Sequence, residues 1–279
     1  MTMVRVSRFA KYSIAGGLAV FTLLWTAPVL WMAALSLRTS HEFYESPYGM
    51  PFPAHWDKFR VAWVEFGYQT YFRNSLIVST TAVLLLIAVG SMAAYFFARY
   101  KFPLKEPLYL MIFAAIMLPP QVPILALFQM LVRYHLYNTL TGLILVYAAS
   151  GLPVTLFLLR AFFAQIPREI EESARIEGAT DWRMYWQVMF PIARPAVVAV
   201  VIINLVEFWN EFLYAVVLIN QQAARTLPLG IMFFMGDREQ DVGMIATGLM
   251  ITILPVFVLY AVFSERITQS LVAGALGSS

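Results

Sequence analysis

The sequence predicts an all-α membrane protein with six transmembrane helices. Apolar residues make up 61% of the 279-residue chain and charged residues only 13%, against about 25% charged residues in a soluble domain. The mean hydropathy of +0.72 points the same way. The absence of cysteine excludes disulfides and thiolate metal sites, and three scattered histidines argue against a histidine-rich metal site. The modest net charge of +3 gives no reason to expect nucleic-acid binding.

Six segments are apolar over the roughly 20 residues that a helix needs to cross a bilayer. They lie near residues 13–37, 74–98, 108–131, 140–163, 196–218 and 242–263. These are continuous apolar runs without the alternation of a strand, so we expect helices, whose backbone hydrogen bonds are satisfied internally. The first segment is longer than the apolar core of a signal peptide, so we expect it to be a span.

The distribution of Lys and Arg predicts that both termini face the cytoplasm, because cytoplasmic loops carry the positive excess. In that orientation 12 basic residues lie inside and 7 lie outside. The bias is clearest in the first two cytoplasmic segments. The segment between the fourth and fifth spans is then cytoplasmic.

Proline is concentrated in the third predicted span, which contains Pro119, Pro120 and Pro123. Pro153 lies in the fourth span and Pro255 in the sixth. Proline removes a backbone hydrogen bond and kinks a helix, and irregular backbone at membrane depth can line a water-filled cavity. We interpret the cluster as a sign of a translocation path; the alternative is ordinary kinking, since proline is common in membrane helices.

The longest segment predicted to lie outside, residues 38–73, is rich in aromatic residues and proline. Disordered linkers are poor in aromatic residues, so we expect a folded surface segment. It suits either a cap over the helix ends or a docking surface for an extracytoplasmic partner. Residues 220–241 are the second candidate for such docking.

The fifth predicted span carries four polar residues, Asn204, Glu207, Asn210 and Glu211. In one continuous helix Glu207 and Glu211 share a face, with Asn204 one turn earlier. A carboxylate near the bilayer centre costs about 2.5 kcal/mol or more, so these side chains should face the bundle interior or a cavity. Three roles remain open: a route for a hydroxyl-rich solute such as a sugar, helix packing, and a proton relay.

A charged island lies between the fourth and fifth spans, at residues 166–195, and holds nine of the chain's 35 charged residues. Pro167 and the glutamates after it suit the positive N-terminal end of a helix. Gly178 is a stop signal, and Thr180 or Asp181 can cap a second helix. We predict two short helices joined by a bend at Gly178. They form either a cytoplasmic contact surface or an interfacial pair that anchors the bundle.

This island resembles the EAA loop of ABC importer permeases, whose pattern is Glu-Ala-Ala, three residues, Gly, nine residues, Ile-x-Leu-Pro. Here the sequence reads Glu172-Ser173-Ala174, then Gly178 at that spacing, then Val188-Met189-Phe190-Pro191. The resemblance implies a coupling helix that docks into an ABC ATPase, with Gly178 permitting the bend. The residues implied in this coupling are Glu172, Ser173, Ala174, Arg175, Gly178, Ala179 and Pro191.

The resemblance extends over nearly the whole chain, which is similar to the maltose-type, carbohydrate-importing subgroup and, within it, to the MalG-like subunit. Further matching pieces are Arg73-Asn74-Ser75, Leu118-Pro119, Trp209-Asn210-Glu211-Phe212 and Thr226-Leu227-Pro228-Leu229-Gly230. It implies the type I ABC importer permease fold. One permease domain would then occupy residues 1–279, with six spans in the bacterial inner membrane and the EAA coupling loop at 166–195.

The resemblance also implies the partners of the chain. A homologous second permease, two ABC ATPase subunits and an extracytoplasmic solute-binding protein would complete the importer, surrounded by membrane lipid. The chain has no GxxxxGK[ST] phosphate loop, so it cannot cradle ATP in the P-loop manner. We expect a transport subunit that is not an enzyme and binds no cofactor, with ATP and Mg²⁺ held by the ATPase subunits.

The implied function is therefore the import of a sugar or oligosaccharide. Two alternatives stay open. One is an ABC permease for another solute, such as a polyol or glycerol phosphate. The other, less favoured, is a proton- or ion-driven secondary carrier that uses Glu207 and Glu211; many such carriers contain inverted repeats, and none is convincing here.

Overall fold

The computed structural model describes residues 8–234 and 241–276, and these residues form helices and connecting loops without a β-strand. Two compact units divide the chain. One comprises Met1–Tyr68 with Ile231–Leu254, and the other comprises Gln69–Gly230 with Pro255–Ser279. Residues 235–240, part of the second predicted docking segment, lie outside the described residues.

The first unit joins the end of one long helix to the start of another. Its described elements are α1 (Arg8–Ser36), α2 (Ser40–Glu45), α3 (Asp57–Arg60), the π-helical turn η1 (Val61–Glu65), the 3-10 turn η5 (Ile231–Phe234) and the first part of α14 (Val242–Leu276). Thr39 starts α2 with a capping box, because its side chain accepts from Glu42 and Glu42 accepts from its backbone. This pairing satisfies N–H groups that a helix start leaves open. The predicted surface segment is thus folded.

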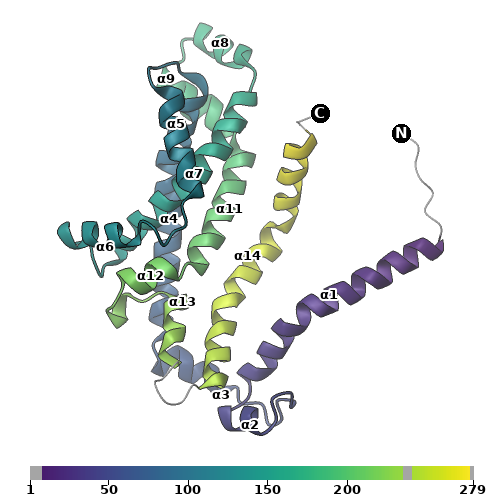
Figure 1. The fold of residues 1–279 in the computed structure, drawn as a ribbon. Helices are drawn as coiled ribbons and strands as arrows, with labels where there is room; N and C mark the ends of the chain where they lie inside the picture. Colours follow the sequence, from purple (N-terminus) through teal and green to yellow (C-terminus); the bar gives the residue numbers. More distant parts are fainter. Residues whose placement is uncertain (1–7, 235–240, 277–279) are drawn as a thin grey trace. The chain divides into compact units, whose positions relative to one another are not determined.

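The second unit contains three helices that run alongside one another, α4 (Tyr68–Arg99), α7 (Leu140–Gln165) and α11 (Arg194–Asn210) (Figure 1). They share two buried apolar cores. The other elements of this unit are α5 (Lys105–Ala114), η2 (Ala115–Met117), α6 (Ile124–Arg133), α8 (Arg168–Ile176), α9 (Asp181–Arg183), η3 (Met184–Met189), α10 (Phe190–Ile192), α12 (Leu213–Leu218), η4 (Gln222–Ala224), α13 (Leu227–Gly230) and the remainder of α14.

Four of the described helices are long and apolar enough to cross a membrane, namely Tyr12–Ser36, Tyr68–Arg99, Leu140–Gln165 and Val242–Ala261. A fifth candidate is the pair Asp181–Ile192 and Arg194–Asn210, bent by 75°. These positions agree with the first, second, fourth and sixth predicted spans. The third and fifth predicted spans differ from one continuous helix, and their breaks have local causes.

In the third predicted span the helix stops at Met117 and resumes only at Ile124. Pro119, Pro120 and Pro123 fall in this gap, and consecutive prolines remove the donors that a helix interior needs. In the fifth, α11 ends at Asn210 because Glu211 takes an extended conformation, with φ −66° and ψ 126°. The expected single helix over 196–218 is therefore corrected to α11, a break and α12.

Candidate functional site

The charged island folds into two helical pieces with a bend at Gly178, as the sequence predicts. The first piece, α8, ends where Gly178 adopts a φ of +83°. The backbone N–H of Ala179 donates to the carbonyl of Ala174 at 2.9 Å, and that of Gly178 donates to Arg175 at 3.0 Å. This pair of bonds is a Schellman motif, which glycine favours because a left-handed residue with a side chain is strained.

The second piece runs through α9, η3 and α10, from Asp181 to Ile192. Thr180 caps its start, because its side chain accepts from the N–H of Arg183 at 3.4 Å. Pro191 lies in α10, close to the end of this helical run at Ile192. The sequence expectation of a cap at Thr180 or Asp181 is thus resolved in favour of Thr180.

The two faces of α8 differ in chemistry. Ile170 and Ala174 are partly buried and pack, with Ala179, against the apolar core of the second unit. Glu172 and Ser173 are exposed, and the side chain of Ile176 is 88% exposed. The small side chain of Ala174 therefore lets α8 lie close to its own chain, and the surface that α8 presents is formed by its other residues.

An ion pair fastens the inner face of α8 to the end of α4. Nε of Arg99 lies 2.6 Å from Oε1 of Glu171, and these side chains are only 6% and 14% exposed. Arg99 also donates through Nη2 to the backbone carbonyl of Ile166. Breaking a buried pair leaves an uncompensated charge in an apolar setting, so α8 and α4 are held together as one body.

A second attachment lies at the C-terminal end of α8. Arg175 Nη2 is 3.0 Å from Oδ1 of Asp181 across the bend. Burial raises the pKa of Tyr100, which follows α4, and its hydrogen bond to Asp181 raises the pKa further. Sequence inspection missed Arg99, Tyr100, Glu171 and Ile176, since only the fold brings the first three together.

The second piece of the island is partly embedded in the same unit. Met184, Tyr185 and Met189 are buried, and the Tyr185 hydroxyl lies 2.6 Å from the Ser91 hydroxyl of α4. On its outer side Trp182 and Trp186 are exposed and stack edge to face. Tryptophan favours the boundary between lipid and water, and the interfacial position of this piece stays a prediction.

Asn204 lies in a helix contact. It is buried, and its Nδ2 donates to Oγ1 of Thr155 in α7 at 3.2 Å and to the carbonyl of Val200 at 2.8 Å. A side chain at Gly151 would collide with Phe208, since an added Cβ would lie 2.9 Å from its ring. The close approach of α7 and α11 at this level therefore needs the glycine, and Asn204 supports packing there.

The other three polar residues of the fifth predicted span separate into two groups. Glu211 is a cap for α12, because its carboxylate accepts from the N–H of Tyr214 at 2.7 Å and from the hydroxyl of Tyr147 at 2.7 Å. Glu207 and Asn210 are exposed on α11. The expected shared helix face of Glu207 and Glu211 is thus corrected, because α11 ends between them. Within the described residues, no three His, Cys, Asp or Glu side chains converge on a metal-sized site.

Known proteins resemble this chain over nearly its full length. It is 36% identical to the diacetylchitobiose uptake system permease protein NgcG of Streptomyces coelicolor over 96% of this chain and 89% of that protein. It is 32% identical to the trehalose transport system permease protein SugB of Mycobacterium tuberculosis, over 89% of this chain and 91% of that protein.

Solved structures share the fold. A chain of a bacterial ABC transporter involved in alginate import superposes with a TM-score of 0.79 at 18% identity, over 95% of this chain and 99% of that one. A second structure, of an alginate ABC transporter with an alginate pentasaccharide-bound periplasmic protein, gives 0.66 at 15% identity over 92% and 96%.

The family model described as the inner membrane component of binding-protein-dependent transport systems matches residues 86–271, which include the whole charged island. With its apolar helices and its likeness to named permeases, the chain belongs to this family and is a multi-pass inner-membrane permease subunit of an ABC importer.

Proposed function

We propose that this permease forms half of a pore that carries a sugar or oligosaccharide into the cytoplasm. A second, homologous permease forms the other half, and two ABC ATPase subunits bind ATP and Mg²⁺ and drive the cycle. A solute-binding protein delivers the solute at the outer face. The periplasmic protein in the alginate transporter structure supports this last partner.

The single observation that carries the coupling role is the two-faced α8. Its inner face is fixed to α4 by the Arg99–Glu171 pair. Its outer face presents Glu172, Ser173 and the almost fully exposed Ile176. Ile176 gives this charged face one exposed apolar side chain, and an apolar centre with a polar rim is the composition of a protein contact. An ATPase that binds this face can move α4 through the buried ion pair.

The same contact reaches α11. The second piece of the island begins at the bend, packs on the core that α4 and α7 share, and continues through α10 into α11. A displacement of α8 is therefore passed to two helices of the bundle. Two such permeases, moved by closing ATPases, would alternate the pore between inward-facing and outward-facing states.

We further propose that the chain crosses the membrane six times with both termini in the cytoplasm. The broken segments α5–α6 and α11–α12 then supply the third and fifth crossings. Breaks at membrane depth suit backbone that is buried in protein or lines a water-filled path. Of the four polar candidates, Glu207 and Asn210 have the exposure that a solute route needs, whereas Asn204 and Glu211 support packing and a helix start.

The substrate class rests on the relatives. The similar permeases are named for uptake of diacetylchitobiose, trehalose and arabinooligosaccharides, and the solved transporters import alginate. A carboxylate and an amide beside aromatic rings can accept hydrogen bonds from sugar hydroxyls. Uptake of labelled oligosaccharides by the reconstituted importer tests this class, with glycerol phosphate and a polyol as competing solutes.

Two glycines give a matched test of the coupling role. Gly178 and Gly67 both have positive φ, +83° and +74°, and a Cβ at either meets nothing within 4 Å. A side chain in the left-handed region costs about 1–2 kcal/mol at both. We expect Gly178→Trp to lose ATPase co-purification and ATP-driven uptake, and Gly67→Trp to keep the co-purification.

Normal co-purification and uptake in Gly178→Trp would contradict the docking role. The strained backbone and the added side chain would then lie on a surface that no partner contacts.

Transport in proteoliposomes distinguishes the importer from the secondary-carrier alternative. Uptake driven by a proton gradient with no ATPase subunit present would exclude the importer mechanism altogether.

A further inference from the structure

The loop between α2 and α3 exposes an unusual set of side chains. From Ser46 to Trp56 there is no Lys, Arg, Asp or Glu, and His55 is the single titratable group apart from Tyr48. Tyr48 is 88% exposed and Phe52 is 85% exposed. The other large exposed side chains of the loop are Met50 and Trp56, and Tyr44 is exposed at the adjoining end of α2. A contiguous exposed apolar segment of this kind indicates contact with a partner or a membrane.

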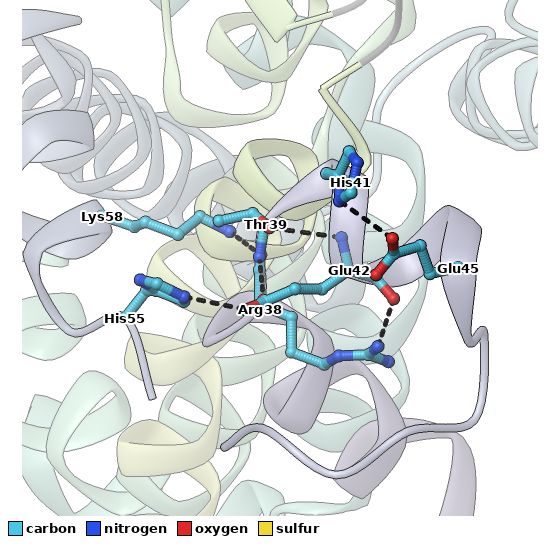
Figure 2. A network of polar contacts seen from close by, with 7 residues as sticks. All are labelled: Arg38, Thr39, His41, Glu42, Glu45, His55 and Lys58. Carbon is cyan, nitrogen blue, oxygen red and sulfur yellow. Dashed lines mark hydrogen bonds and ion pairs between the residues drawn. The ribbon is translucent and has the colours of Figure 1, made fainter. Parts of the chain in front are cut away.

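The start of the loop is wrapped around a buried cation. Arg38 is buried, and its Nη2 donates to the backbone carbonyl of Glu42. A Cβ added at Gly49 would lie 2.9 Å from that same Nη2 and 3.1 Å from Oγ of Ser46. The loop backbone therefore closes directly over the guanidinium, and the Arg38 charge is turned inward (Figure 2).

The end of the loop is held by the residues around Arg38. The backbone N–H of His55 donates to the carbonyl of Leu37 at 2.9 Å. Its Nε2 lies 3.1 Å from Oε1 of Glu42, whose other oxygen accepts from the backbone of Thr39 at 2.8 Å. Figure 2 shows His55, Glu42 and Arg38 converging. The polar groups at both ends of the loop thus bond to one another and to the nearby backbone, and the apolar side chains between them are exposed.

The loop also lies beside the last turns of a membrane span. Nε1 of Trp31, in α1, donates to the carbonyl of Pro47 at 3.4 Å. The ring of Trp31 lies 6.4 Å from that of Phe43 in α2. Trp31 precedes the end of α1 at Ser36 by five residues, a distance of about 7.5 Å along a helix. The loop therefore folds back along the last turns of α1, a helix that is long and apolar enough to cross a membrane.

We propose that residues 46–56 are a lipid anchor, a loop whose exposed aromatic side chains enter the boundary between the lipid headgroups and the acyl chains. Tyrosine and tryptophan favour this boundary because their rings are apolar and their tips are polar. This loop has no side-chain cation or carboxylate, so it suits contact with lipid better than contact with the polar rim of a protein interface. The proposal rests on the membrane placement in the proposed function and is independent of the solute carried.

Depth measurement by spin labelling tests the anchor. Because the chain has no cysteine, Tyr48→Cys and Phe52→Cys each give one labelling site at a position exposed enough to leave the fold intact. Glu45→Cys, on the exposed polar face of α2, is the matched control. Each variant is assembled with partner subunits freed of reactive cysteines and placed in vesicles of phosphatidylethanolamine and phosphatidylglycerol. Collisions with oxygen and with the water-soluble nickel complex NiEDDA are then compared.

The anchor predicts labels at 48 and 52 that collide often with oxygen and rarely with NiEDDA, at a depth of about 5–10 Å below the headgroup boundary. The label at 45 should collide freely with NiEDDA. Added solute-binding protein should leave the depth unchanged. Free NiEDDA access at 48 and 52 would overturn the anchor. Protection from both reagents would also overturn it, because a protein subunit then covers the loop.

Protection that occurs only with the solute-binding protein would contradict the anchor as well and identify a docking loop. The two proposals fail separately. A deep label in an assembly that takes up no solute with ATP would remove the proposed function and keep the anchor. A shallow label in an active importer would remove only the anchor.

Discussion

The charged island at residues 166–195 and the α2–α3 cap, residues 38–60, distribute charged and apolar side chains between buried and exposed positions in opposite ways. In the island, α8 turns its small and apolar residues inward and presents charges with Ile176 outward. In the cap, Arg38 and Lys58 are buried, while aromatic rings face outward. We therefore propose different partners for the two surfaces. Exposed charges around one apolar side chain suit a folded protein, and exposed aromatic rings without side-chain cations suit lipid.

The largest effect is expected in the charged island, when the ion pair between Arg99 and Glu171 is broken. Arg99→Leu leaves Glu171 buried without its partner, and removing one member of a buried pair typically costs about 3–5 kcal/mol. We expect a lower unfolding temperature and loss of ATP-driven uptake even though the outer face of α8 is untouched. The control is the double variant Arg99→Leu, Glu171→Leu, which should recover most of the stability. A single variant as stable as the unmodified chain would show that the pair does not hold α8.

A smaller effect is expected on the cap side. Arg38→Leu removes the guanidinium that the loop encloses and leaves polar backbone groups without a partner, at a cost of about 1–3 kcal/mol. A spin label at position 48 should become markedly more mobile. Arg60→Leu is the control, because Arg60 is exposed on the neighbouring helix α3. Unchanged label mobility in Arg38→Leu would mean that the loop is held by other contacts.

The cap should also show a pH dependence. Burial lowers the pKa of Lys58 to about 8, with Asp241, Asp57 and Glu42 opposing the shift. Between that value and the ordinary 10.5 the unfolded state binds more protons, so stability should rise with pH across this window. The control is Lys58→Met, which should lose this rise. A rise that persists in Lys58→Met would assign it to another group.

At low pH a carboxylate acts in the same cap. Hydrogen bonds from the Thr39 backbone and from His55 lower the pKa of Glu42 below 4.5. Its contribution is present above pH 4.5 and is lost as the pH falls through the lowered value. The unfolding temperature of Glu42→Gln should therefore change less with acid than that of the unmodified chain.

Local chemistry made much of this fold predictable. The bend at Gly178 and the cap at Thr180 depend on neighbours within six residues, so the local sequence is enough to predict both features. Four of the six apolar segments agree with long described helices, because hydropathy over about 20 consecutive residues is also a property of the local sequence. The prolines between Met117 and Ile124 predicted irregularity, although the length of the gap depends on packing.

The rest depends on contacts between distant residues. Arg99 and Glu171 are far apart in the chain, and neither stands out until α4 and α8 meet. The role of Glu211 changed because α11 ends one residue earlier, which makes its carboxylate a cap for α12. A hydropathy pattern does not distinguish a helix from two helices joined by one extended residue. The aromatic and proline content of residues 38–73 was visible in the sequence, but the contact of Pro47 with Trp31 was not.

Photo-crosslinking at two equally exposed positions tests the central claim most directly. Ile176 and Tyr48 are each 88% exposed, and each is replaced with benzoylphenylalanine in the assembled importer in vesicles. The account predicts that a crosslinker at 176 captures an ATPase subunit, whereas one at 48 captures lipid and no subunit. An assembled importer in which the crosslinker at 176 captures no ATPase would contradict it.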